Sequence, residues 1–347
     1  MAAKRSPHRA DLVLSGGGVK GIGLVGAVVA LKDAGYSIQR ISGTSAGSLV
    51  GSVVAAAVHR NELTSDQLRE LALSVPYRKF RDSGPIESIP VLGTAWGLLR
   101  ETGIYRGDFA YDWIRSELKN LGVKTFGDLA IKDDNLLPER CYRLTVTVTD
   151  VTTGQLVRLP WDYRRVYGLD PDEQLVADAV RASMAIPFLF HPVTLKTADG
   201  QACTLVDGGV LSNFPIDTFD RPDGAEPRWP TFGVTVVPYL PAPSAEQLIP
   251  GLGMLSFGRP SLLESLITTM LVGHDQAYLS QPWVKVRAIQ VDSTAVGVLD
   301  FDISRGEAQA LYEKGYAATT DFLSTWDWPG YLDRFRRAHR VDPRQVE

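Results

Sequence analysis

The chain has 347 residues, of which 44 % are hydrophobic and 22 % are charged, and its formal net charge is -4. This composition is ordinary for a soluble globular protein. The small negative charge argues against nucleic acid as the main partner, because phosphate binding usually requires a basic excess. The length would hold two average domains, although α/β enzymes of this size often form one.

Cysteine content and apolar stretches indicate the compartment. Cys141 and Cys203 are the only cysteines, so a disulfide framework is not expected and a reducing cytoplasm is the default. Residues 1–10 are not followed by an apolar region long enough for a signal peptide. The apolar stretches 22–31 and 49–58 are too short to span a bilayer. We therefore expect a cytoplasmic protein whose contact with a membrane surface is peripheral.

The first sixty residues alternate between strand and helix patterns. An apolar run at 11–15 predicts a strand, and the Ala/Val/Leu-rich segment 21–34 predicts a helix that ends at Gly35. The same pair of patterns recurs at 38–42 and 46–59. This order, with short turns, is typical of a parallel sheet covered by helices and joined by right-handed crossovers.

The rest of the chain also divides into helices and strands. Asp170, Pro171 and Glu173 occupy the N-cap, N1 and N3 positions of a helix that is expected to run to about Met184. The other expected helices are at 65–73, 108–121, 261–278 and 304–325, and the expected strands are at 143–149, 202–206, 231–237 and 284–291.

A glycine-rich turn follows the first expected strand. Gly16, Gly17 and Gly18 can present backbone N–H groups to a developing oxyanion, and Lys20 and Gly21 complete the turn. The same glycines fit the G-x-G-x-x-G fingerprint of dinucleotide-binding proteins. That fingerprint requires an acidic residue at the end of the second strand. This sequence has none there, so we disfavour a dinucleotide.

A second motif begins the second expected helix. Gly43-Thr44-Ser45-Ala46-Gly47 is a G-x-S-x-G box, in which a serine between glycines can lie on a sharp strand-to-helix turn with its hydroxyl exposed. The alternative is that Ser45 only caps the helix. Its expected place at the carboxyl end of a parallel strand, where open α/β sheets build their sites, favours a nucleophile.

A serine nucleophile needs a base to remove its proton. The five histidines are His8, His59, His191, His274 and His339. None of them lies in a recognisable base motif. Asp207, followed by Gly208 and Gly209, is the better candidate, because a carboxylate buried at a strand end has a raised pKa. A tight turn with a solvated Asp207 is the alternative.

Taken together, these motifs resemble the patatin-like phospholipase family. That family carries G-G-G-x-[KR]-G, then G-x-S-x-G, then D-G-[GA], and this chain has them at 16–21, 43–47 and 207–209. The flanking segments 147–154 and 181–188 agree, and the resemblance covers 10–220 firmly. It departs from the family pattern at His191, where the family often has Pro or Phe.

The resemblance implies a three-layer α/β/α fold with a central, largely parallel sheet. It makes Ser45 the nucleophile and Asp207 the base of a Ser-Asp dyad, with the N–H groups of Gly16, Gly17 and Gly18 as the oxyanion hole. The loops around them would be supported by Lys20, Gly21, Gly43, Gly47, Gly208 and Gly209. No cofactor or metal is expected, since the sequence has no His/Cys ligand cluster and no calcium loop.

The activity implied by the resemblance is hydrolysis of acyl esters of phospholipids or lysophospholipids, with the lipid as partner. Neutral glycerides and acyl thioesters are alternative substrates on the same fold. Two further interpretations remain open. One is a conventional Ser-Asp-His hydrolase that uses His274, and the other is a regulatory scaffold that has lost turnover.

No repeat or linker divides the chain. We therefore expect one catalytic domain at 9–325, with polar tails at 1–8 and 328–347. Two apolar segments that contain glycine, 86–104 and 248–271, are candidates for a mobile cover over an acyl-chain cleft.

Overall fold

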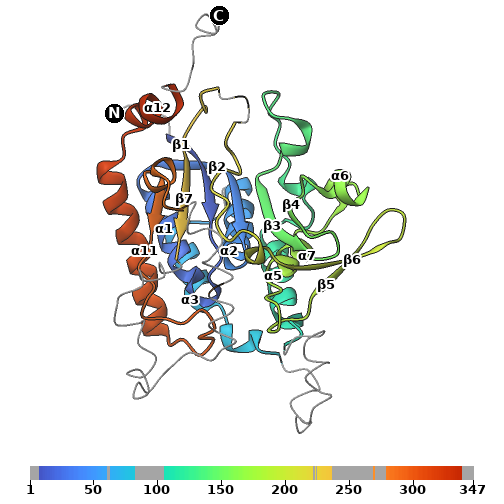
Figure 1. Ribbon diagram of the computed structural model, residues 1–347. Coiled ribbons are helices and arrows are strands. Elements are labelled where there is room, and N and C mark those ends of the chain that lie inside the picture. Colours follow the sequence, from blue (N-terminus) through green and yellow to red (C-terminus); the bar gives the residue numbers. More distant parts are fainter. Residues whose placement is uncertain are drawn as a thin grey trace, which may run out of the picture.

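The computed structural model describes residues 8–60, 63–82, 105–221, 223, 225–236, 269 and 279–337. Within these ranges it contains an eight-stranded sheet with helices on both sides (Figure 1). The strands are β1 (His8–Leu14), β2 (Tyr36–Thr44), β3 (Leu144–Asp150), β4 (Gln155–Leu159), β5 (Val193–Lys196), β6 (Ala202–Asp207), β7 (Thr231–Thr235) and β8 (Ala288–Gln290). Their order is β5-β6-β3-β2-β1-β7-β8, with β4 paired to β3 outside this path.

The sheet is parallel around β1 and antiparallel beyond β3. Parallel pairs join β1 to β2 and β7, β2 to β3, and β7 to β8. Antiparallel pairs join β3 to β4 and β6, and β5 to β6. The expected three-layer fold with a largely parallel sheet is therefore confirmed, and the antiparallel strands on one side are an addition to it.

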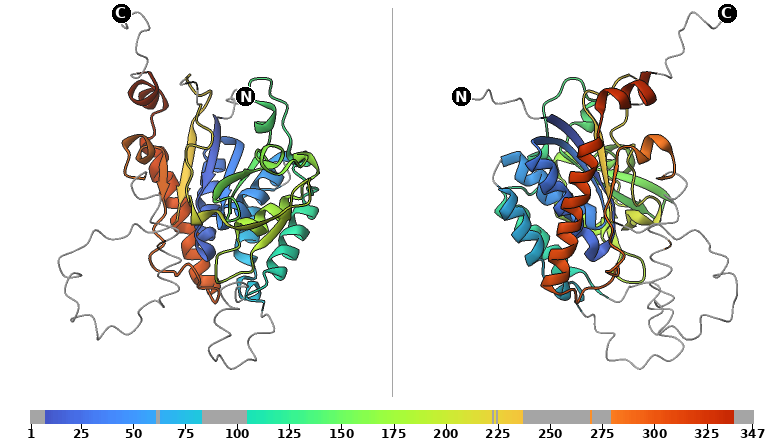
Figure 2. Two further views of the ribbon diagram at one scale, coloured as in Figure 1. Left: turned by 45° about the vertical axis from the view of Figure 1, so that its right-hand side comes forward. Right: turned by 90° about the vertical axis from the view of Figure 1, so that its left-hand side faces the viewer.

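Helices form the outer layers. They are α1 (Gly21–Asp33), α2 (Ala46–Arg60), α3 (Ser65–Ser74), α5 (Asp108–Asn120), α6 (Tyr163–Tyr167), α7 (Val176–Ser183), α10 (Pro282–Lys285), α11 (Arg305–Thr325) and α12 (Trp328–Leu332). Helices α1, α2 and α3 lie on one side of the sheet and α10 on the other (Figure 2). Helix α11 packs on α1 so closely that Gly26 and Gly315 have no room for a Cβ.

The register of β3 brings two strand ends together. Val146 pairs with both Gly43 of β2 and Leu159 of β4, so β2 and β4 lie on opposite sides of β3. Val148 pairs with Val157 of β4 and Asp207 of β6. Strand β6 therefore continues on the side of β2. Because β2 is parallel and β6 antiparallel to β3, their carboxyl ends meet head to head.

The last residues of β2 and β6 are placed by neighbouring residues of β3. Thr147 pairs with Thr44, and the next residue, Val148, pairs with Asp207. Successive residues in a strand are about 3.3 Å apart. The segment that follows Thr44 therefore begins beside Asp207, although 162 residues of sequence separate Ser45 from Asp207 (207 − 45).

Several elements differ from the sequence expectations. The helix expected from Asp170 is split: Asp170 caps a 3-10 turn at Pro171–Glu173, and α7 begins only at Val176. The strand expected at 284–291 is wrong in its first half, where Pro282 starts α10 and the strand is confined to β8. Strands β4 and β5 were not expected.

Residues 328–337 belong to the folded part of the chain, although a polar tail was expected from 328. They form α12 and a π-helical turn at Asp333–Arg337. Tyr331 and Leu332 are buried. Arg336 pairs with Asp220 at 2.9 Å. The candidate cover at 86–104, all of 248–271 except Thr269, and most of the helix expected at 261–278 lie outside the described residues.

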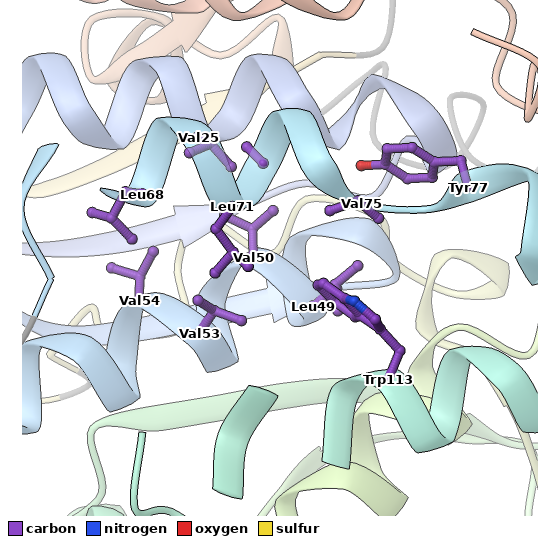
Figure 3. A pocket seen from close by; sticks show the side chains of 11 residues that line it. Val25, Leu49, Val50, Val53, Val54, Leu68, Leu71, Val75, Tyr77 and Trp113 are labelled. Carbon is purple, nitrogen blue, oxygen red and sulfur yellow. The ribbon is translucent and has the colours of Figure 1, made fainter. Parts of the chain in front are cut away.

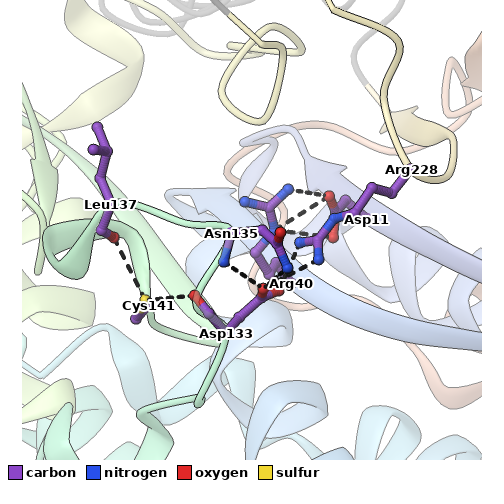
Figure 4. Close-up of polar contacts among 7 residues, drawn as sticks. All are labelled: Asp11, Arg40, Asp133, Asn135, Leu137, Cys141 and Arg228. Atoms are coloured by element: carbon purple, nitrogen blue, oxygen red, sulfur yellow. Dashed lines mark hydrogen bonds and ion pairs between the residues drawn. The ribbon is translucent and has the colours of Figure 1, made fainter.

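A buried ion pair joins β1 to β2 far from their carboxyl ends (Figure 4). The Arg40 guanidinium donates to the Asp11 carboxylate, with Nη2 2.5 Å from Oδ2, and lies 4.5 Å from the centre of the Phe219 ring. A register shift between Ala10 and Leu12 sets the two charged residues opposite each other. Both side chains are almost wholly excluded from solvent.

None of the helices in the described ranges is long and apolar enough to cross a bilayer.

Candidate active site

Ser45 lies on a strained turn between β2 and α2. Its φ is 51°, which is uncommon for a residue other than glycine. The flanking glycines are required by close backbone approach: a Cβ at Gly43 would lie 2.2 Å from the Gly47 carbonyl oxygen, and one at Gly47 would lie 2.3 Å from that of Leu14. This is the geometry of a nucleophile elbow, in which the serine is held at the tip of the turn.

Ser183, the last residue of α7, braces the turn. The Ser45 N–H donates to Ser183 Oγ at 2.8 Å, and the Ser183 hydroxyl donates to the Thr147 carbonyl at 2.7 Å. This links the elbow to β3. Sequence reasoning included Ser183 only as part of a flanking segment, because nothing in its local pattern indicates a partner 138 residues away.

Asp207 lies at the end of β6 and is 1 % exposed. Its Oδ1 accepts the Gly209 N–H at 2.8 Å. Burial raises the pKa of Asp207 to about 7, against the opposing effects of hydrogen bonding by Ser45 and the Gly209 N–H. In the described part of the chain, Oδ2 makes no hydrogen bond of ordinary distance and angle.

The glycine-rich turn lies against Ser45. A Cβ at Gly16 would lie 3.0 Å from that of Ser45, and the Gly16 N–H donates to the Asn213 carbonyl at 3.2 Å. Gly18 has a φ of 58° and approaches the Val298 carbonyl so closely that a Cβ would lie 2.1 Å from its oxygen. Among the described residues, the N–H groups of Gly17 and Gly18 have no backbone partner.

The other residues expected to support the two loops are closely packed. Lys20 is buried, with 4 % of its surface exposed. A Cβ at Gly21 would lie 3.1 Å from that of Ala46, and one at Gly208 would lie 2.3 Å from the Thr147 carbonyl oxygen. Gly209 is buried and donates its N–H to Asp207.

The described histidines are not part of this cluster. His59 lies in the last turn of α2, and His191 follows Phe190 at the start of the segment that leads to β5. No histidine in the described ranges hydrogen-bonds to Ser45 or Asp207. His274 lies outside those ranges. The described part of the chain also has no group of three or more His, Cys, Asp or Glu side chains arranged to hold a metal ion.

An apolar cavity lies beside α2 (Figure 3). Side chains from α1, α2, α3 and α5 line it, among them Leu49, Val53 and Trp113. Leu49 and Val53 lie one and two turns beyond Ser45 on the same face of α2. The cavity volume is about 30 Å³, well below the roughly 150 Å³ of an apolar cavity that admits benzene. In this conformation it is too small for an acyl chain.

A parallel α/β core with a serine on a strained strand-to-helix turn is the architecture of hydrolases that work through a nucleophile elbow. The chain belongs to the patatin-like phospholipase family, whose family model matches residues 12–220. At the level of this family, it is a lipid acyl hydrolase.

Relatives agree with this assignment. The chain is 34 % identical over 323 residues to the uncharacterized protein YqhO of Bacillus subtilis (strain 168), covering 92 % of this chain and 99 % of that protein. It is 28 % identical over 207 residues to lysophospholipase NTE1 of Yarrowia lipolytica, covering 59 % of this chain but only 11 % of that protein.

A solved structure has the same fold. The chain superposes on VipD from Legionella pneumophila with a TM-score of 0.50 and 19 % identity, covering 92 % of this chain and 67 % of that one.

Proposed function

We propose that this protein hydrolyses acyl esters of phospholipids or lysophospholipids through Ser45 and Asp207. The Ser45 hydroxyl attacks the ester carbonyl while Asp207 takes its proton. The negative charge that develops on the carbonyl oxygen is stabilised by the N–H groups of Gly17 and Gly18. Gly16 positions this turn, because its own N–H is bonded to Asn213. Collapse of this intermediate leaves an acyl group on Ser45 and releases the alcohol.

The same two residues complete the second half of the reaction. Asp207 returns its proton to the leaving alkoxide and then accepts one from water, which attacks the acyl-enzyme. Release of the fatty acid regenerates the Ser45 hydroxyl. The site carries one negative charge throughout, which passes from the Asp207 carboxylate to the oxyanion and back, and each proton moves between Asp207 and the oxygen of Ser45, the leaving alcohol or water.

The observation that carries this proposal is the buried carboxyl of Asp207 beside the elbow. A carboxylate with a pKa near 4 is a weak base, whereas one with a pKa of about 7 is matched to a proton transfer at neutral pH. Burial supplies this rise, because it disfavours the charged form. The head-to-head arrangement of β2 and β6 supplies the proximity to Ser45.

The substrate class is supported by the family and by the name of one relative, lysophospholipase NTE1. We propose a lipid as the partner, with peripheral contact between the protein and the lipid surface in the cytoplasm. Neutral glycerides and acyl thioesters present the same carbonyl to the same two residues, so the experiment must separate them by product.

The test is mass spectrometry of lipid products from wild type, Ser45→Ala and Asp207→Asn, on phospholipid, lysophospholipid, diacylglycerol and acyl-thioester substrates. We expect fatty acid release from the phospholipid or lysophospholipid by the wild type, and none above background by either variant. His59→Gln is the control for a histidine base among the described residues. Equal turnover by Ser45→Ala would refute the mechanism, and release from only diacylglycerol or thioester would refute the substrate class.

A further inference from the structure

A second cavity lies on the far side of α7 from Ser45. It has a volume of about 370 Å³ and is lined by Arg106, Asp108, Tyr111, Arg181, His191, Pro192 and Val193. Arg181 lies two residues before Ser183, which holds the Ser45 N–H. Two residues turn a helix by about 200°, so Arg181 and Ser183 point to opposite sides of α7. The cavity and Ser45 are therefore separated by about 10 Å, the thickness of a helix.

Arg181 is a buried cation without a bonded carboxylate. Only 8 % of its surface is exposed, and its Nη2 donates to the carbonyls of Arg106 and, at 3.0 Å, His191. In the described part of the chain, Nη1 has no hydrogen-bond partner and no carboxylate lies within ion-pair distance. Asp82 supports the Arg181 charge from further away, but its oxygens accept the N–H groups of Gly107 and Phe109.

Two other polar residues at the cavity, Arg106 and His191, also lack fixed partners, whereas Tyr111 is hydrogen-bonded to Asp178. Arg106 is exposed and makes no ion pair with any described residue, and the His191 imidazole makes no hydrogen bond there. Burial lowers the pKa of His191, and Arg181 and Arg106 lower it further against the weaker opposing effects of Asp108 and Asp82. The electrostatic potential at the imidazole is therefore positive, although Asp108 also lines the cavity.

An exposed aromatic side chain, Phe188, precedes the cavity residue His191 by three positions in the chain. Phe188 is 43 % exposed and has a φ of 68°, a conformation that only a few residues other than glycine adopt. Its neighbour Phe190 packs within 5.9 Å of both the Arg181 guanidinium and the Tyr105 ring. The backbone therefore holds an apolar ring in solvent, close in sequence to Phe190 and His191.

We propose that this cavity binds the phosphate group of a phospholipid in a lipid surface, with Arg106 and His191 as donors and Arg181 as the buried positive charge. Phe188 then lies where the acyl region begins, which is the usual arrangement of an aromatic side chain beside basic residues at a membrane interface. The separation of about 10 Å from Ser45 assigns this phosphate to a neighbouring lipid and not to the molecule being cleaved. The inference rests on the proposed lipid function for its biological meaning, but the binding itself does not require turnover.

The test uses the full chain with Ser45→Ala, so that no lipid is consumed, and two kinds of vesicle. One is phosphatidylcholine, and the other is digalactosyldiacylglycerol, which has the same acyl esters but no phosphate. Co-sedimentation measures the partition of the protein. We expect Arg106→Gln to weaken binding to phosphatidylcholine about tenfold and to leave binding to the galactolipid within twofold. Phe188→Ser is expected to weaken binding to both.

Arg115→Gln is the matched control, because Arg115 is an exposed arginine on α5 that makes no ion pair with a described residue. It is expected to change neither partition. Equal effects of Arg106→Gln and Arg115→Gln, or an equal loss on both vesicles, would overturn the proposal. A third result would also overturn the proposal: inorganic phosphate perturbs the His191 NMR signals, but vesicle binding does not depend on Arg106. The cavity would then be a site for a soluble anion.

These results are separable from those of the proposed function. Arg106-dependent binding to phosphatidylcholine by a protein that releases no fatty acid would support this inference and refute the hydrolase. Fatty acid release by a protein whose vesicle binding is unaffected by Arg106→Gln would support the hydrolase and refute this inference.

Discussion

The Asp207 carboxyl is expected to reduce the stability of the folded protein at neutral pH. Its pKa is about 7 in the folded state, compared with 3.8 for an ordinary aspartate. Between these two values the folded state keeps the proton and the unfolded state has lost it, so the free energy of unfolding falls as the pH rises. The full difference corresponds to about 4 kcal/mol above pH 7, of which about 3 kcal/mol develops between pH 5 and 8.

Asp207→Asn removes this penalty, because the amide is neutral at every pH and its oxygen can still accept the Gly209 N–H. We expect the variant to be inactive and yet more stable than the wild type at pH 8. The free-energy difference between the two proteins should grow by about 3 kcal/mol from pH 5 to pH 8. Urea unfolding at each pH measures it.

Other carboxyl groups cancel in this comparison, because both proteins contain them. The control is Asp134→Asn, which makes the same change of side chain at an exposed position. A pH-independent difference for Asp207→Asn, or a loss of stability that deepens toward pH 8, would refute a buried carboxyl with a raised pKa.

Three further predictions follow from the same contacts. Since Asp207 must be ionised to act as a base, kcat/KM should rise about tenfold per pH unit below pH 7 and level off above it, and a flat profile from pH 5 to 8 would contradict this. Ser183→Ala removes the acceptor of the Ser45 N–H and should lower kcat about tenfold or more, as measured by steady-state kinetics; an unchanged kcat would show that the elbow holds its shape without it. Arg40→Met leaves Asp11 buried without its partner and should cost about 3–5 kcal/mol in urea unfolding, whereas the double variant with Asp11→Leu should recover most of that loss.

The parts of the fold that could be predicted from the sequence depend on local pattern. The first two strands and the first helix follow from apolar runs that end at glycines, and Ser304 caps the start of α11. The split of the helix after Asp170 was missed because a capping sequence specifies where a helix starts, not how far it continues. Strand β5 has half-buried and exposed residues only, so its sequence lacks the apolar run that marks a buried strand.

The candidate site also contains residues that local motifs predict and residues that only tertiary packing brings together. Ser45 and Asp207 are flanked by glycines that the backbone geometry requires, so short motifs were enough to select them. Ser183 contacts the Ser45 turn, and Asn213 and Val298 contact the glycine-rich turn. These contacts depend on how distant strands align, which cannot be predicted from the local sequence. The sequence singled out His191 as one of five candidate histidines and as a departure from a family pattern, whereas its place beside Arg181 depends on tertiary packing.

Strands β2 and β6 both pair with β3, so β3 sets the distance between Ser45 and Asp207. Thr147 and Val148, which are adjacent in β3, hold the ends of β2 and β6. A shift of the register by one residue would therefore change the distance between the nucleophile and the base. Side chains along 144–150 can therefore be exchanged within the limits of packing, whereas inserting or deleting a single residue would separate the two groups. The length of this strand therefore matters to the site independently of the side chains it carries.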